Sequence, residues 1–102
     1  MVIDKPGFGA FYRTALEEHL QSCGITHLVF TGVTTQCCVL SSLREAVDRG
    51  FHCLTLEDAC AAVSPVLHDA ALTTIAGEGH LFGWVGQAED FIAACDVKGT
   101  ES

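Results

Sequence analysis

Short apolar runs alternate with helical patterns along the whole chain, and this alternation constrains the fold more than any other feature. Strands are predicted for the apolar runs HLVFTGV (27–33), FHCLTLED (51–58) and HLFGWV (80–85). Helical spacing of apolar residues predicts helices over 10–23, 35–49, 66–76 and 88–95. The alternation indicates right-handed crossover units and a parallel sheet with helices on both faces, with an active site at the carboxyl ends of the strands.

Turn and cap residues define where these elements begin and end. Gly24 and Gly50 follow the first two helices, as C-terminal cap residues do. Either Thr34 or Thr35 is expected to cap the second helix through its side chain, and Ser64 followed by Pro65 is a typical start for the third. The opening residues MVI resemble the end of another strand, and the run 27–33 is so apolar that both of its faces are expected to be covered.

Size and charge limit the classes of protein that this chain can represent. The 102 residues suffice for one domain, and a hydrophobic content of 49% excludes a disordered chain. A net charge of −8 with only 5 lysines and arginines argues against binding a nucleic acid or an anionic membrane surface. The apolar runs are all far shorter than the roughly 20 residues of a membrane-spanning helix.

The six cysteines are best interpreted as reduced thiols of a cytoplasmic protein. Their spacing matches neither a zinc site nor a thioredoxin-type pair, and no signal peptide precedes them. The five histidines share no spacing typical of metal ligands. We therefore expect neither a metal nor an organic cofactor.

Cys37 and Cys38 lie where a strand gives way to a helix, and this is where a nucleophile is favoured. The first turn of a helix has amides without intrahelical partners, which favour a thiolate and can bind an oxyanion. Lys5 follows the first strand-like segment, so it should reach the same edge of the sheet and assist the thiol. Cysteine pairs near helix starts are more often packing residues, and the helical wheel does not choose between the two thiols.

Two further groups of residues have simple structural explanations. Phe8 and Phe11, close to Lys5, are weak candidates for the wall of a substrate pocket, because aromatic residues at a helix start usually serve packing. Arg44, Glu45, Asp48 and Arg49 are spaced to pair with one another on a helix surface.

The segments VIDKPGFGAFYRTALEEHL and GVTTQCCVLSSLREAVDRGFHCLTLEDAC closely resemble the isochorismatase-like cysteine hydrolase family. The likeness is greatest to its amide-cleaving branch, which includes ureidoacrylate, biuret and N-carbamoyl-amine hydrolases. The resemblance implies a three-layer α/β/α, Rossmann-like parallel sheet. It also implies that Cys38 is the nucleophile, that Lys5 is catalytic, and that a cis peptide joins Val33 to Thr34 at the oxyanion site.

The family's third catalytic residue, an aspartate at the end of the first strand, has no counterpart here. Asp4 is unsuitable because neighbouring residues of an extended chain point to opposite sides, and Asp58 is better explained as a cap or a loop anchor. The resemblance therefore implies that residues 1–102 are the C-terminal portion of a single hydrolase domain, truncated at its N-terminus. We expect such a chain to form a homo-oligomer or to pair with the missing N-terminal half.

Two functions follow from the resemblance. In the first, the chain is an enzyme that cleaves a C–N bond of a small amide or ureido substrate through a thioester on Cys38. In the second, it is a catalytically inactive remnant or an interaction subunit of the same fold.

Overall fold

The computed structural model describes residues 2–101, with side chains described for residues 2–95, and it contains a parallel sheet. The strands are β1 (His27–Val33), β2 (His52–Ala61) and β3 (Trp84–Gly86), and they lie in the order β1-β2-β3. Both neighbouring pairs are parallel, with Leu28 opposite Cys53 and Thr55 opposite Val85. The parallel α/β architecture predicted from the alternation is confirmed.

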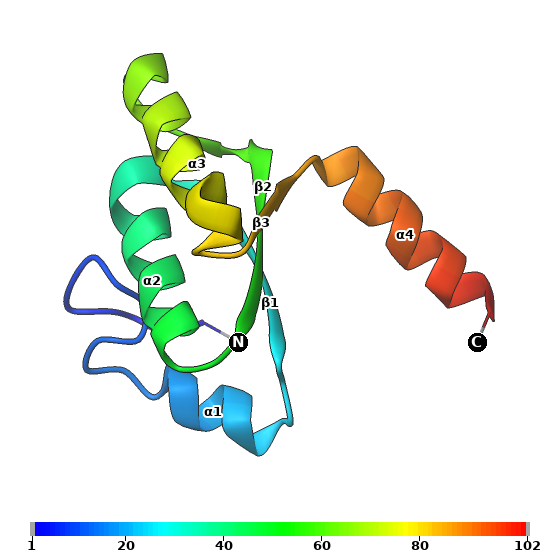
Figure 1. Cartoon of the computed structure of the whole chain (residues 1–102). Helices are drawn as coiled ribbons and strands as arrows, with labels where there is room; N and C mark the ends of the chain where they lie inside the picture. Colours follow the sequence, from blue (N-terminus) through cyan, green and yellow to red (C-terminus); the bar gives the residue numbers. More distant parts are fainter. Residues whose placement is uncertain (1, 102) are drawn as a thin grey trace.

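Helices flank the sheet on both sides (Figure 1). The helices are α1 (Leu16–Ser22), α2 (Leu40–Asp48), α3 (Pro65–His80) and α4 (Ala88–Glu101), and a π-helical turn, η1 (Thr35–Val39), leads directly into α2. In Figure 1, α2 and α3 cover one face, whereas α4 leaves the sheet on the opposite side, after contacting β2.

The hydrophobic core lies between the sheet and the layer formed by α2 and α3. Leu43 of α2 and Ile75 of α3 are fully buried, and Cys53 of β2 meets them from the sheet. Phe11 and Phe51 close this core near α1, with ring centroids 5.9 Å apart. The apolar side that helical spacing predicts for residues 35–49 is therefore the surface that packs on the sheet.

Most of the predicted element boundaries are confirmed. Gly24 and Gly50 have φ values of +71° and +88°, a conformation that glycine adopts without strain after a helix. The hydroxyl of Ser64 accepts a hydrogen bond from the Leu67 amide at the start of α3. Thr34 is the N-cap residue of η1, which is one of the two expected alternatives, but its side chain makes no capping hydrogen bond.

Two predicted elements are shorter than expected, and the strand expected at the N-terminus is not formed by the residues described. The first helix begins at Leu16 rather than at residue 10, because residues 10–14 form a bend in which the Thr14 hydroxyl donates to the Ala10 carbonyl. Val2 and Ile3 belong to no strand, and Met1 lies outside the described residues. The last strand begins only at Trp84, because a turn with several positive φ angles occupies residues 77–83.

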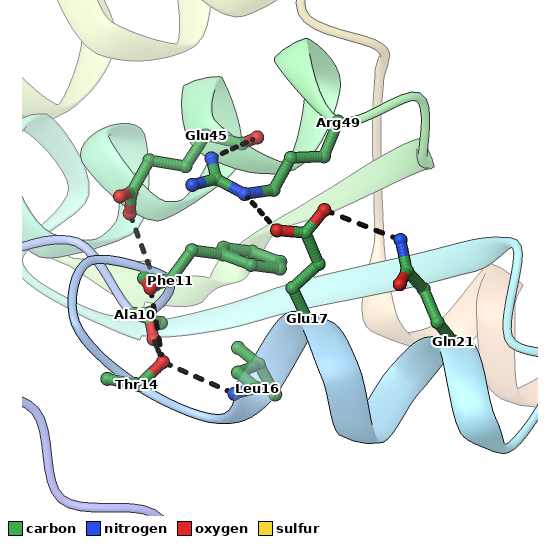
Figure 2. Close-up of polar contacts among 8 residues, drawn as sticks. All are labelled: Ala10, Phe11, Thr14, Leu16, Glu17, Gln21, Glu45 and Arg49. Atoms are coloured by element: carbon green, nitrogen blue, oxygen red, sulfur yellow. Dashed lines mark hydrogen bonds and ion pairs between the residues drawn. The ribbon is translucent and has the colours of Figure 1, made fainter.

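The bend before α1 is joined to α2 by polar contacts (Figure 2). The Phe11 amide donates to the Glu45 carboxylate, and Arg49 Nε donates to Glu17 Oε1 at 3.0 Å, linking α2 to α1. The Arg49 guanidinium also lies 5.0 Å from the centre of the Phe11 ring. The predicted charge pairing within the α2 surface is therefore wrong for Glu45 and Arg49, whose charged groups contact Phe11 and Glu17. Arg49 Nη1 also donates to the Glu45 backbone carbonyl at 3.0 Å.

Strand β1 forms one edge of the sheet and is largely exposed. Val29 and Val33 keep 43% and 69% of their surface accessible, so the expectation of a strand covered on both faces is wrong for the residues described. The face turned away from α2 and α3 has an apolar hollow that Trp84 and Phe91 help to line. A strand that is apolar and yet lacks a neighbour at its outer edge is open to pairing with another segment.

None of the helices within residues 2–101 combines the length and the apolar character that crossing a membrane requires.

Candidate active site

A cavity of about 250 Å³ opens at the carboxyl end of β1. Its walls come from the N-terminal loop, from the end of β1, and from the start of the helix that follows. The lining residues are Lys5, Ala10, Phe30, Thr31, Gly32, Val33, Cys38, Val39 and Ser42. Carboxyl ends of strands in parallel sheets are where such folds place their binding sites.

Lys5 and Cys38 meet in this cavity although 33 residues separate them in the sequence. Lys5 Nζ donates to the Gly7 carbonyl at 2.7 Å and lies 3.8 Å from Cys38 Sγ, in position to donate to it. This contact places a positive charge beside the sulfur atom. The structure thus brings together the two side chains that the sequence singled out as a nucleophile and its cationic partner.

Contacts with α2 hold the loop that carries Lys5. The amide of Ala10 donates to the Ser42 hydroxyl at 2.9 Å, and the Ser42 side chain is buried. Ser42 lies one helical turn after Cys38, so the same helix supports both the loop and the thiol. Sequence reasoning missed Ser42, although its spacing of four residues from Cys38 places it on the same helical face.

The backbone around Cys38 follows the π-helical turn η1. The carbonyl of Thr34 accepts hydrogen bonds from the amides of Cys37 and Val39 at 3.0 and 3.1 Å. The peptide joining Val33 to Thr34 is cis, as the family resemblance led us to expect. Cys38 therefore lies in the first turn of a continuous helical segment that runs from η1 into α2.

The surroundings of Cys37 raise the pKa of its thiol. Burial raises the pKa of the Cys37 thiol, the neighbouring Cys38 raises it further through charge and hydrogen bonding, and Lys5 opposes them only partly. Cys37 therefore tends to stay protonated.

Two other thiols are held in the neutral form by the core. Burial raises the pKa of Cys53 to about 11. Burial also raises the pKa of Cys60, with a smaller opposing effect from a backbone hydrogen bond with Gly32. Across the described residues all six cysteines are free thiols, and Cys23 and Cys95 are exposed.

The two phenylalanines expected at the wall of a substrate pocket lie outside the lining of this cavity. Phe11 is only 4% exposed and packs in the core, under Arg49. Phe8 is 67% exposed and lines a separate hollow, together with Tyr12 and Arg44. Neither phenylalanine lines the cavity that contains Cys38.

Acidic side chains are missing from the lining of this cavity, as far as the described residues show. Asp4 is exposed and is not among the lining residues. Asp58 accepts a hydrogen bond from the Ala88 amide at 2.8 Å, so it anchors the start of α4, as its predicted role as a cap or loop anchor required. The described side chains also include no group of three or more His, Cys, Asp or Glu suited to a metal ion.

The parallel sheet with its flanking helices agrees with comparisons to known proteins. A family model described as the isochorismatase domain matches residues 1–90, and the chain therefore belongs to the isochorismatase family.

Relatives of known name are longer than this chain. The ureidoacrylate amidohydrolase of Acinetobacter baylyi is 38% identical over 93 residues, which cover 90% of this chain and 37% of that protein. The ureidoacrylate amidohydrolase of Methylobacterium radiotolerans is 40% identical over 98 residues, which cover 95% of this chain and 37% of that protein. The chain thus spans less than two fifths of the length of these relatives.

Solved structures share this fold over the matched residues. An isochorismatase-like hydrolase from Alkaliphilus metalliredigens superimposes with a TM-score of 0.85 at 28% identity, over 91% of this chain and 49% of that one. The nicotinamidase of Bacillus subtilis superimposes with a TM-score of 0.77 at 30% identity, over 81% of this chain and 45% of that one.

Proposed function

We propose that this chain carries the nucleophile and the lysine of a cysteine hydrolase that cleaves a C–N bond of a small amide or ureido compound. The observation that carries the proposal is the 3.8 Å separation of Lys5 Nζ and Cys38 Sγ in a cavity at the carboxyl end of β1. The relatives named ureidoacrylate amidohydrolase support the choice of substrate class.

In the first half of the proposed reaction, the Cys38 thiolate attacks the carbonyl carbon of the substrate. The carbonyl oxygen becomes an oxyanion, which backbone amides of the Val33–Cys38 segment stabilise. The C–N bond then breaks, the leaving nitrogen takes a proton from Lys5, and a thioester remains on Cys38. This half uses only groups that lie in or beside the cavity.

In the second half, water attacks the thioester and releases the acid. This step needs a base to take a proton from the water, and a positioned base typically contributes about a hundred- to ten-thousand-fold in rate. The cavity lining described above contains no carboxylate. We therefore propose that the chain alone is acylated faster than it is deacylated, and that a partner segment or chain supplies the base.

The test separates acylation from turnover. The chain is mixed with a panel of ureido and carbamoyl compounds, and intact-mass spectrometry follows the acyl adduct while an ammonia assay follows turnover. We expect an adduct on Cys38 with no more ammonia or amine than the single equivalent that acylation itself releases, and continued release when the N-terminal portion of the Acinetobacter baylyi relative is added. The Cys38→Ala variant should form no adduct, whereas Cys37→Ala should still form one. An adduct that survives Cys38→Ala would refute the nucleophile, and full turnover by the chain alone would refute the need for another base.

The exposed edge of β1 favours a second candidate function. An apolar edge strand without a neighbour promotes association, so the chain can act as a non-catalytic interaction subunit that binds a second copy or a homologous chain. Sedimentation velocity at micromolar concentration tests this function, for which we expect a dimer or a larger species. A stable monomer that forms the Cys38 adduct would favour the enzyme instead. For either function we propose a cytoplasmic location, which the free thiols support.

A further inference from the structure

A partly buried hydrogen bond joins the turn that carries Cys38 to helix α3. Thr35 Oγ1 and His68 Nδ1 lie 2.8 Å apart, although the two residues are separated by 33 positions in the sequence. Thr35 is the first residue of η1, and none of its surface is exposed. The reaction proposed above makes no use of this pair.

The buried hydroxyl of Thr35 depends on the ring of His68. A buried hydroxyl that lacks a hydrogen-bond partner destabilises the conformation that buries it. His68 lies in the first turns of α3, where its own amide donates to the Ser64 carbonyl at 3.1 Å. The ring therefore belongs to a capped helix start, and it can serve as a partner for Thr35.

The position of Thr35 affects the backbone around Cys38 directly. The preceding carbonyl, that of Thr34, accepts the hydrogen bonds from the Cys37 and Val39 amides on either side of Cys38. A change in where the Thr35 side chain is held therefore rotates the peptide that organises this turn. Helix α3 packs against η1, so the pair fixes the turn to the rest of the core.

We propose that Thr35 and His68 are positioning residues, which hold η1 so that the Cys38 thiol stays within reach of Lys5. The proposal rests on the proposed role of Cys38 as the nucleophile. Neither residue is assigned a contact with substrate, and both act through the backbone of the turn.

The test measures the alkylation rate of each thiol in the folded chain. Iodoacetamide is added at pH 7, and mass spectrometry follows Cys38, with buried Cys53 as an internal reporter of unfolding. Thr35→Val and His68→Ala remove the hydrogen bond, whereas Thr35→Ser and His68→Asn are matched controls that retain a hydrogen-bonding group. Urea unfolding of each variant gives its stability separately.

We expect Thr35→Val and His68→Ala each to slow alkylation of Cys38 about fivefold, as the loss of roughly one hydrogen bond predicts. Labelling of Cys53 should not change, and the two controls should stay within about twofold of the wild type. The double variant Thr35→Val/His68→Ala should be no slower than either single variant, because both remove the same contact.

Two results would overturn the proposal in different ways. If the variants unfold at lower urea but alkylate Cys38 at the wild-type rate, the pair only stabilises the fold and positions nothing. If wild-type Cys38 reacts no faster than exposed Cys23, the nucleophile assignment fails, and this inference fails with it. Should Thr35→Val not fold, His68→Ala alone decides, because His68 is only partly buried.

Discussion

Replacing Lys5 by methionine should slow alkylation of Cys38 by a predictable amount. The variant keeps the length of the side chain but removes the charge that lies 3.8 Å from Cys38 Sγ. Two unit charges at that distance attract by about 1 kcal/mol in water and by about 4 kcal/mol at the dielectric constant typical near a protein surface. Because Lys5 is exposed, the lower figure applies, and it corresponds to about a fivefold loss in the alkylation rate of Cys38.

The assay measures the second-order rate constant for alkylation of Cys38 by iodoacetamide at pH 7. The measurement is made at low salt and again at about 1 M salt, where the Debye length falls to roughly 3 Å and the charge of Lys5 is screened. Lys5→Arg serves as the control, because it preserves the charge and should stay close to the wild type. The difference between wild type and Lys5→Met should shrink at high salt. Equal rates for both proteins at low salt, or a loss that salt leaves unchanged, would show that the charge of Lys5 does not activate Cys38.

Three further predictions concern the packing that supports the site. Ile75→Ala, at a fully buried position, should lower the free energy of unfolding by about 3 kcal/mol in urea titrations. Gly83→Ala should be far more damaging than Gly24→Ala in thermal melts, because a Cβ at Gly83 would lie 2.3 Å from the Cys53 carbonyl oxygen, whereas Gly24 has open space around it. Both glycines have positive φ, so equal effects would contradict the clash. Burial raises the pKa of Cys53 from 9.0 to about 11, so the folded state holds this proton more tightly and stability should fall as pH rises from 9 to 11. Cys53→Ala should lack that part of the pH dependence.

Local patterns predicted the strands and helices well where apolar spacing and end signals agreed. Gly50 ends the helical segment that follows β1, and Ser64 with Pro65 begins α3, because these residues act through their own backbone or a neighbouring amide. The same patterns misplaced the start of α1. Phe11 has helical spacing relative to Leu16 and Leu20, but it belongs to the bend before α1 and packs into the core from there. Spacing of apolar residues alone does not distinguish such a bend from a helix.

Features that depend on distant contacts were not accessible from local sequence. Threonine is a residue type that often caps helices, but Thr35 is the first residue of η1 and its hydroxyl contacts His68 of α3. The exposure of β1 depends on what lies beside its outer edge, whereas its apolar sequence indicates only that it is suited to burial. Lys5 and Cys38 do meet as expected, but not because two strand ends converge, since Val2 and Ile3 belong to no strand. The loop that carries Lys5 is instead held near Cys38 by the hydrogen bond from the Ala10 amide to Ser42 of α2.

The hydrogen bond from the Ala10 amide to Ser42 has a consequence for how the protein opens. Through it, and through the Glu45 contact to Phe11, the loop that carries Lys5 is attached to the same helix that continues from Cys38. Amide hydrogen exchange should therefore release the Ala10 and Phe11 amides together with those of α2, as one cooperative unit rather than as a fraying N-terminus. In that case the backbone at Ala10 and Phe11 comes away from the site only when α2 itself comes away from the sheet.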